Sequence, residues 1–86
     1  MYKVYIIKSI NKDKYYVGFT KNLKNRLKRH NSGSVRSTKS YRPWKTVYSE
    51  EYDNKTEARK RELQIKSWKS KTSIEKLINQ APSSNG

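Results

Sequence analysis

Residues 2–20 contain two stretches in which apolar and polar residues alternate, separated by a short polar segment. This pattern restricts the fold more than any other part of the chain. Tyr2–Ser9 and Tyr15–Thr20 alternate from residue to residue and are rich in β-branched and aromatic side chains, which favour strands. Between them, Ile10–Lys14 is polar and contains Asn and Asp, which are common in turns. The stretch therefore predicts a β-hairpin.

The length of the loop also predicts how the two strands pair. A four-residue loop, 10–13, would pair Tyr5 with Gly18 and Ile7 with Tyr16. Directly opposed residues share a face of the sheet, so we expect Tyr5, Tyr16 and Gly18 to lie together. A slip of one residue would put the two tyrosines on opposite faces. Glycine weakens a strand unless another group approaches its backbone, so we expect Gly18 to leave room beside Tyr5 for a side chain or a substrate.

The rest of the chain alternates between helical patterns and one more strand. Leu23 and Leu27, four residues apart, form the apolar stripe of a first helix, and Gly33 is a natural left-handed stop after it. The expected elements are, in order, a helix over Leu23–Asn31, a mobile basic loop over Ser34–Arg42, a strand over Trp44–Tyr52, and helices from Lys55 to Ser67 or Trp68 and over Ser73–Asn79. This β-β-α-β-α-α order predicts one α+β domain over residues 1–80, followed by a disordered tail over 81–86.

The charge of the chain indicates its class of partner. The sequence contains 21 Lys and Arg against 7 Asp and Glu, a net charge of +14 that is spread along the chain. Such a field attracts polyanions, and nucleic acid is the expected partner. A merely soluble basic surface and adsorption to an anionic membrane are the alternatives, but no stretch forms a basic amphipathic helix with a broad apolar face.

Composition excludes several other classes of protein. The absence of cysteine rules out a disulfide framework, and a single histidine argues against a structural zinc site. Lys3 and Lys8 interrupt the apolar positions near the start of the chain. We therefore expect no signal peptide, no membrane span and a cytoplasmic location.

Glu62 is the residue that is hardest to explain by structure alone. Successive residues of an α-helix turn by about 100°, so Ala58, Glu62 and Ile65 fall within about 60° of one another. Glu62 therefore lies in the apolar stripe, where a lone carboxylate is costly unless it is paired, bound to metal or placed at the edge of a cleft. A helix-surface ion pair with Arg59 or Lys66 is the structural alternative.

Taken together, these residues resemble the GIY-YIG nuclease superfamily. The matching residues are Val4-Tyr5-Ile6 on the first strand, Tyr16-Val17-Gly18 on the second, Arg26 and His30 on the first helix, and Glu62 on a later helix. The Arg42-Pro43-Trp44 turn is similar to the small stand-alone branch of the superfamily, which resembles the N-terminal nuclease domain of the UvrC repair protein. Lys3 stands where the first motif usually has glycine. The resemblance implies a small three-stranded antiparallel sheet flanked by helices.

The resemblance also implies a role for each motif residue. Tyr5 corresponds to the general base that takes a proton from the attacking water, and Tyr16 to a second tyrosine that positions water or phosphate. Arg26 would contact the phosphate, His30 would orient the phosphate or assist proton transfer, and Glu62 would hold Mg²⁺ or Mn²⁺. The structural alternatives are strand packing for the tyrosines, surface charge for Arg26 and helix capping for His30.

Tyrosine with an ordinary pKa of about 10 is a poor base, so nearby cations would have to favour the Tyr5 phenolate. Some relatives use a lysine at the place of Lys8, but on an ideal strand this residue leaves the Tyr5 face. Asn79 is a looser match to an asparagine of several relatives, and Trp44 is expected in the core. The cations expected to contact nucleic acid are Lys8, Lys39, Arg42, Arg59, Arg61 and Lys66. A solvated basic face formed by Arg59, Arg61, Lys66, Lys69 and Lys71 is expected to take a non-specific share in DNA binding.

The sequence therefore predicts a Mg²⁺- or Mn²⁺-dependent endonuclease, or a nuclease-like repair factor, that acts on DNA. One rival hypothesis is a non-catalytic nucleic-acid-binding module on the same scaffold, and the completeness of the motif set argues against it. The other is a structural basic protein of the ribosome or nucleoid, which would not need Glu62 on an apolar helix face.

Overall fold

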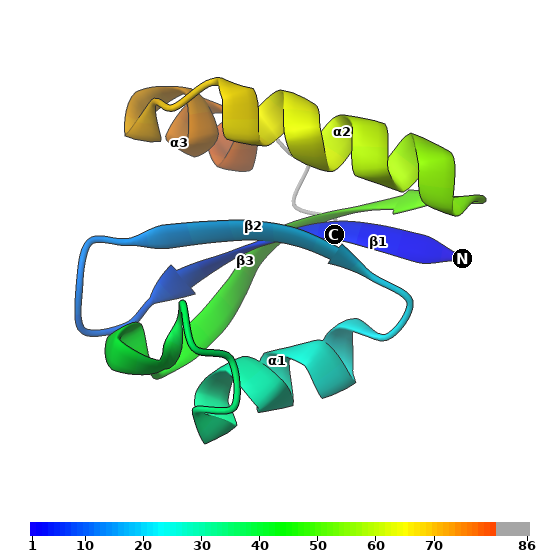
Figure 1. Cartoon of the computed structure of the whole chain (residues 1–86). Helices are drawn as coiled ribbons and strands as arrows, with labels where there is room; N and C mark the ends of the chain where they lie inside the picture. The colour runs from blue at the N-terminus through cyan, green and yellow to red at the C-terminus, as the bar shows by residue number, and fades with distance from the viewer. Residues whose placement is uncertain (81–86) are drawn as a thin grey trace.

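An antiparallel sheet of three strands lies between two helical layers (Figure 1). The computed structural model describes residues 1–80, and the tail expected over 81–86 lies outside the described residues. The strands are β1 (Tyr2–Ser9), β2 (Tyr15–Thr20) and β3 (Trp44–Tyr52), and the helices are α1 (Leu23–Ser32), the short 3₁₀ helix η1 (Lys39–Tyr41), α2 (Lys55–Ser67) and α3 (Lys71–Gln80). The expected α+β architecture and the order of its elements are confirmed.

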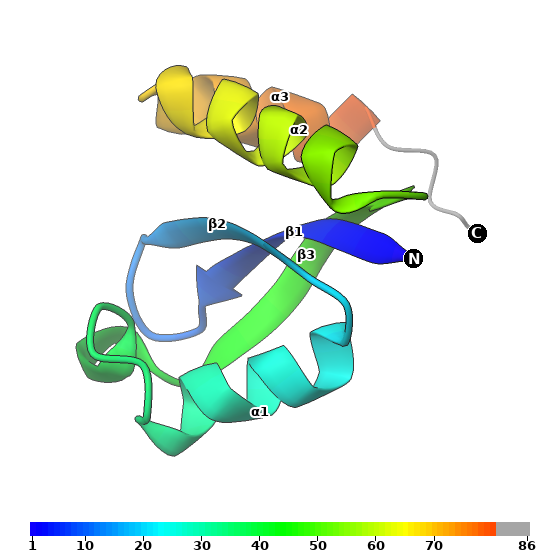
Figure 2. The ribbon, with the colours of Figure 1, turned by 45° about the vertical axis from the view of Figure 1, so that its right-hand side comes forward.

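Strand β1 forms the centre of the sheet, whose order is β2-β1-β3. Helices α2 and α3 lie over one face, while α1 and the segment that carries η1 lie over the other (Figures 1 and 2). Strand β2 is therefore an edge strand with helices on both sides of it. Within residues 1–80, no helix combines the length and the apolar character needed to cross a bilayer.

The pairing predicted for the hairpin is confirmed. Tyr5 is opposite Gly18 and Ile7 is opposite Tyr16, so the two tyrosines and the glycine share one face of the sheet. On its other side β1 pairs with β3, and the register shifts between Ile6 and Ile7. The face shared by Tyr5 and Tyr16 is the one that α1 covers.

Alternate residues of β1 supply two separate cores. Towards α2 and α3, the buried apolar side chains are Val4, Ile6, Val17, Ala58 and Ile65. Towards α1, they are Tyr5, Ile7 and Trp44, which confirms Trp44 as a core residue. Because tyrosine and tryptophan carry a polar atom on an apolar body, the second core takes polar groups inside and needs partners for them.

The helix ends follow from capping residues. Gly33 closes α1 with φ of 85°, the left-handed conformation expected of it. The last helix, α3, starts at Lys71, two residues before the predicted start at Ser73. The reason is a cap, because the side chain of Ser70 accepts a hydrogen bond from the backbone N–H of Ser73 at 3.3 Å.

The segment between α1 and β3 differs from the mobile loop that was predicted over Ser34–Arg42. Thr38 is only 1% exposed, and the 3₁₀ helix η1 follows it directly. The carbonyl of Thr38 accepts a hydrogen bond from the indole Nε1 of Trp44 at 2.9 Å. Serine, lysine and arginine dominate this stretch, so its composition predicts a mobile loop. The burial of Thr38 depends on contacts with other elements, which composition does not indicate.

Glu50 ties β3 to α2. Its carboxylate accepts hydrogen bonds from Tyr48, from Tyr52 at 2.6 Å and from Nε of Arg61 at 2.9 Å. Burial opposes ionisation, but the hydrogen bonds from Arg61 and the two tyrosines outweigh it and lower the pKa of Glu50. The guanidinium of Arg61 also lies over the ring of Trp68. The prediction of a solvated Arg61 is therefore wrong, because a carboxylate on another element holds its side chain.

Candidate active site

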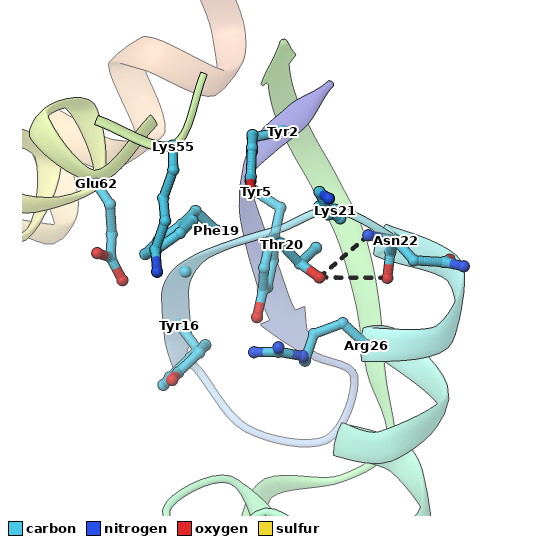
Figure 3. A pocket seen from close by; sticks show the side chains of 11 residues that line it. Tyr2, Tyr5, Tyr16, Phe19, Thr20, Lys21, Asn22, Arg26, Lys55 and Glu62 are labelled. Atoms are coloured by element: carbon cyan, nitrogen blue, oxygen red, sulfur yellow. Dashed lines mark hydrogen bonds between the residues drawn. The ribbon is translucent and has the colours of Figure 1, made fainter. Parts of the chain in front are cut away.

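A pocket of about 500 Å³ opens along the edge of β2 and is lined from both helical layers (Figure 3). Tyr5 and Tyr16 reach it from the sheet, Arg26 from α1 and Glu62 from α2. Gly18 also lines the pocket. We call it the active-site pocket. It brings together five residues that were selected from the sequence and that lie up to 57 positions apart, from residue 5 to residue 62.

Gly18 makes room for the hydroxyl of Tyr5. A Cβ atom at residue 18 would lie 2.6 Å from Tyr5 Oη and 2.8 Å from Cζ of the same ring. Tyr5 is fully buried, so its ring cannot swing away without disturbing the core. The only side chain compatible with this position of the Tyr5 hydroxyl is therefore a hydrogen atom.

A hydrogen-bonded chain runs from Tyr5 into the protein. Tyr5 Oη lies 3.0 Å from Nε2 of His30, and Nδ1 of His30 lies 2.8 Å from Oγ1 of Thr38. His30 and Thr38 are each 1% exposed. Because the Thr38 hydroxyl can donate to the carbonyl of Val35 at 3.4 Å, its oxygen is free to accept Nδ1–H of His30. We therefore assign the tautomer in which Nε2 accepts the proton of Tyr5.

The electrostatic surroundings keep both members of this pair neutral. Burial lowers the pKa of His30, and the nearby cations Arg26 and Arg29 lower it further, which favours the neutral imidazole whose Nε2 can accept the hydrogen bond of Tyr5. Burial and the neighbouring Tyr16 raise the pKa of Tyr5 to about 12, although Arg26 acts in the opposite direction. The expected cationic stabilisation of the phenolate thus exists, but burial outweighs it.

Arg26 and Glu62 face the pocket from opposite sides. The guanidinium of Arg26 points towards the hydroxyl of Tyr5, while the carboxylate of Glu62 points towards Tyr16 (Figure 3). Glu62 is 7% exposed, in agreement with its place on the apolar stripe of α2. Its Oε2 atom lies 3.0 Å from Nζ of Lys66, so the ion pair considered from the sequence is also present.

The chemistry of this donor set fits a hard divalent cation. Residues 1–80 contain no cluster of three or more His, Cys, Asp or Glu side chains that could enclose a metal ion. Mg²⁺ does not need such a cage, because it keeps several waters and often binds through one or two carboxylates plus substrate phosphate. The carboxylate of Glu62 faces an open pocket and already attracts a cation, the ammonium of Lys66.

The other residues selected from the sequence lie elsewhere. Lys8 points to the opposite face of the sheet from Tyr5, with its ammonium 5.9 Å from the ring centre of Tyr15. Asn79 lines a separate pocket with Tyr15, Glu75 and Ile78. The residues Lys39, Arg42, Arg59 and Arg61 do not line the active-site pocket, and Lys66 reaches it only through its ion pair with Glu62.

Several polar residues at the site were not selected from the sequence: Thr20, Lys21, Asn22 and Lys55 line the pocket, and Thr38 lies behind it. Lys55 lines the active-site pocket, and its spacing of seven residues from Glu62 on α2 was a usable signal because such residues share a helix face. Thr38, which partners His30, had no such signal. Its role depends on the path of the chain after Gly33, which residue spacing does not encode.

Comparison with known proteins connects these features to a family. The family model described as the GIY-YIG catalytic domain matches residues 1–77. A UPF0213 protein of Staphylococcus saprophyticus is 39% identical over 79 residues, which cover 90% of this chain and 93% of that protein. A UPF0213 protein of Clostridium perfringens is 44% identical over 64 residues, covering 73% and 68%. The solution NMR structure of a UPF0213 protein from Bacillus halodurans superposes with a TM-score of 0.60 at 28% identity, covering 94% of this chain and 86% of that one.

Proposed function

The chain belongs to the GIY-YIG catalytic domain family, and on that premise we propose that it is a divalent-metal-dependent endonuclease that hydrolyses phosphodiester bonds in DNA. The observation that carries the proposal is the meeting of Tyr5, Arg26 and Glu62 in one open pocket at the edge of β2. These three side chains supply a proton acceptor, a phosphate ligand and a carboxylate. The net charge of +14 supports a polyanionic substrate.

Arg26 holds the scissile phosphate in this proposal. A guanidinium is always charged and can donate two parallel hydrogen bonds to phosphate oxygens, which a lysine cannot reproduce. Its guanidinium points towards the Tyr5 hydroxyl (Figure 3), which supports a role in which Arg26 would hold a phosphate next to the proton acceptor. Arg26 therefore fixes the direction from which water attacks.

Tyr5 and His30 move the proton of the attacking water. Tyr5 accepts this proton at Oη while its own phenolic proton passes to Nε2 of His30, 3.0 Å away. The phenol therefore never has to ionise on its own, which its pKa of about 12 would prevent at neutral pH. The resulting hydroxide attacks phosphorus, the bond to the leaving oxygen breaks, and that oxygen takes a proton from solvent. The proton on Nε2 of His30 then returns to Tyr5, which releases its extra proton to solvent and restores the starting state. Thr38 keeps the imidazole in the accepting tautomer.

Glu62 would hold the divalent cation in this proposal. When bound, the cation supplies charge neutralisation at the phosphate and stabilises the leaving oxygen. Lys66 has to share or give up the Glu62 carboxylate when the cation binds, because its ammonium lies 3.0 Å from Oε2. Tyr16 lies between the proton-transfer chain and this ion pair, because its ring centre is 5.0 Å from that of His30 and 5.8 Å from the ammonium of Lys66.

A plasmid-nicking assay tests the proposal. Supercoiled DNA is incubated with the purified chain and Mg²⁺ or Mn²⁺, with EDTA as the metal-free control. We expect Glu62→Gln to lower the nicking rate by about 100-fold or more. Glu51→Gln is the matched control, because Glu51 is an exposed carboxylate on β3 that lies outside the active-site pocket. Equal nicking by both variants would contradict the proposal, and DNA binding without nicking on duplex, branched and single-stranded DNA would favour the non-catalytic module.

A further inference from the structure

A second pocket, of about 420 Å³, lies along the same edge of β2, towards the start of the strand. The residues that line it come from the first part of β2, from the loop before η1, from the end of α2 and from the start of α3. Four lysines and no carboxylate contribute to this lining: Lys14, Lys66, Lys69 and Lys71. We call it the lysine pocket.

The lysine pocket adjoins the active-site pocket. Tyr16 lines both of them, and Lys66 of the lysine pocket is paired with Glu62 of the active-site pocket. On β2 the lining of the lysine pocket is centred on Tyr16 and that of the active-site pocket near Gly18, two residues further on, which corresponds to about 7 Å along a strand. A polymer bound in one pocket can therefore reach the other within a few monomer units.

The four lysines are not equally available to a ligand. Lys71 is paired with Asp13, Lys66 is paired with Glu62, and the ammonium of Lys14 lies 5.5 Å from the ring centre of Tyr41. Lys69 is exposed and forms no ion pair with any of residues 1–80. Lys14 and Lys69 are thus the cations of this pocket that can bind an anion without giving up an acidic partner, and of these two only Lys14 lies over an aromatic ring.

The backbone of Lys69 also points to a function for its side chain. Its φ is 49°, and it is the only residue other than glycine with a positive φ in the described part of the chain. Glycine and asparagine adopt this left-handed conformation most easily, and a lysine there costs stability. Lys69 directly follows Trp68, the C-cap residue of α2, where helices commonly end in this conformation. A lysine in place of glycine there, inside a pocket without acidic groups, puts a cation where an anion can bind.

We propose that the lysine pocket binds the phosphate backbone of the same DNA strand that is cut in the active-site pocket, with Lys69 as its principal contact. The ligand is a phosphodiester a few nucleotides away from the scissile one. This inference rests on the proposed nuclease function for the identity of the strand, but the binding itself requires neither metal nor cleavage.

Fluorescence anisotropy with labelled oligothymidylates tests the inference. Chains of about 4 to about 12 nucleotides are titrated with protein in EDTA, so that no cleavage can occur. We expect the wild-type affinity to rise once the oligonucleotide is long enough to occupy both pockets. In Lys69→Gln this rise should be lost, the affinity for the long chain should fall about 3- to 10-fold, and the slope of log K against log salt should decrease by about 0.7.

Lys60→Gln is the matched control, because Lys60 is an exposed lysine of α2 that lines neither pocket. Equal losses in Lys69→Gln and Lys60→Gln, or a loss in Lys69→Gln that is the same for every length, would overturn the inference. An absence of any oligonucleotide binding by the wild type would overturn it too. If Lys69→Gln shows the expected defect but Glu62→Gln nicks DNA normally, the binding site stands and the proposed catalytic site does not.

Lys69→Gly separates binding from folding. Glycine relieves the left-handed strain, so this variant should melt about 4 °C higher than the wild type. It should nevertheless bind the long oligonucleotide as weakly as Lys69→Gln, because both variants lack the charge. Weaker binding accompanied by a lower melting temperature would assign Lys69 a structural role and contradict the proposal.

Discussion

The two faces of the sheet bury polar groups in opposite ways. On the side of α2, the carboxylate of Glu50 is surrounded by Arg61, Tyr48 and Tyr52, and each of these partners points inward to it. On the side of α1, Tyr5 and His30 form a chain that starts in the core and ends at the active-site pocket. A closed network stabilises the fold, whereas a chain that is open at one end can accept a proton from a water molecule in the pocket.

Two tyrosines, one on each face, show that the same residue type can have very different surroundings. Tyr48 and Tyr5 are both tyrosines of the sheet whose pKa is raised to about 12. The hydroxyl of Tyr48 is used by Glu50, while that of Tyr5 meets a histidine and an open cavity. A raised pKa alone therefore does not identify a catalytic residue, whereas a raised pKa in a group that lines an open pocket makes it a candidate.

The largest expected effect comes from removing the hydroxyl at the open end of the chain. Tyr5→Phe should lower metal-dependent nicking by about 10²- to 10⁴-fold, because the attacking water loses its proton acceptor. Tyr48→Phe is the control that removes the equivalent hydroxyl from the closed network. It should weaken the fold slightly and leave the rate per folded molecule unchanged. A comparable loss of nicking in both variants would remove the functional distinction between the two faces.

The second effect concerns the inner end of the same chain. Thr38→Val keeps the shape of the side chain but leaves Nδ1–H of His30 without an acceptor, so nicking should fall about 10-fold and its pH profile should shift. Thr38→Ser keeps the hydroxyl and should retain most of the activity. Nitrogen-15 NMR of the His30 ring reports the tautomer directly, and a purely structural role for Thr38 would leave that spectrum unchanged.

The hairpin and the position of Glu62 could be predicted because both depend on local periodicity. The register of Tyr5 and Gly18 follows from a two-residue period and a short loop, and burial of Glu62 follows from the pitch of one helix. These two rules placed Tyr5, Tyr16, Gly18 and Glu62, whereas Arg26 was selected by the resemblance to the family. They apply within one element or between neighbouring elements, and this is the range over which the predictions held.

The errors concern side-chain contacts between different elements, even where these elements follow one another in the chain. Arg61 has the surroundings of a solvated helix residue in the sequence, but Glu50, eleven residues earlier, engages it from β3. Thr38 has the surroundings of a mobile loop, but His30 and Trp44 hold it in the interior. In both cases the deciding partner is a side chain on another element, so neither spacing nor composition could indicate it.

The third prediction tests whether the closed network has only a structural role. Arg61→Met removes the two charged hydrogen bonds to Glu50 while keeping some of the contact with Trp68, and should cost about 2 kcal/mol of unfolding free energy. Urea denaturation measures this cost. The nicking rate and the DNA affinity per folded molecule should stay at wild-type levels, in contrast with Lys69→Gln. A defect in DNA affinity would restore the nucleic-acid role that Arg61 was given on the basis of sequence.

The smallest effects should appear in the pH dependence of stability, where the two faces of the sheet should respond in different pH ranges. Burial lowers the pKa of His30, so the unfolded chain binds a proton more readily than the native state and stability falls as the pH drops below about 6.5. The pKa of Glu50 is lowered as well, so its contribution is lost only in more acidic solution, below about 4.3. Urea midpoints should therefore decrease in two separate ranges. His30→Gln should abolish the first decrease and leave the second, whereas Glu50→Gln should do the reverse. A single acid transition that neither substitution alters would show that the two faces do not titrate independently.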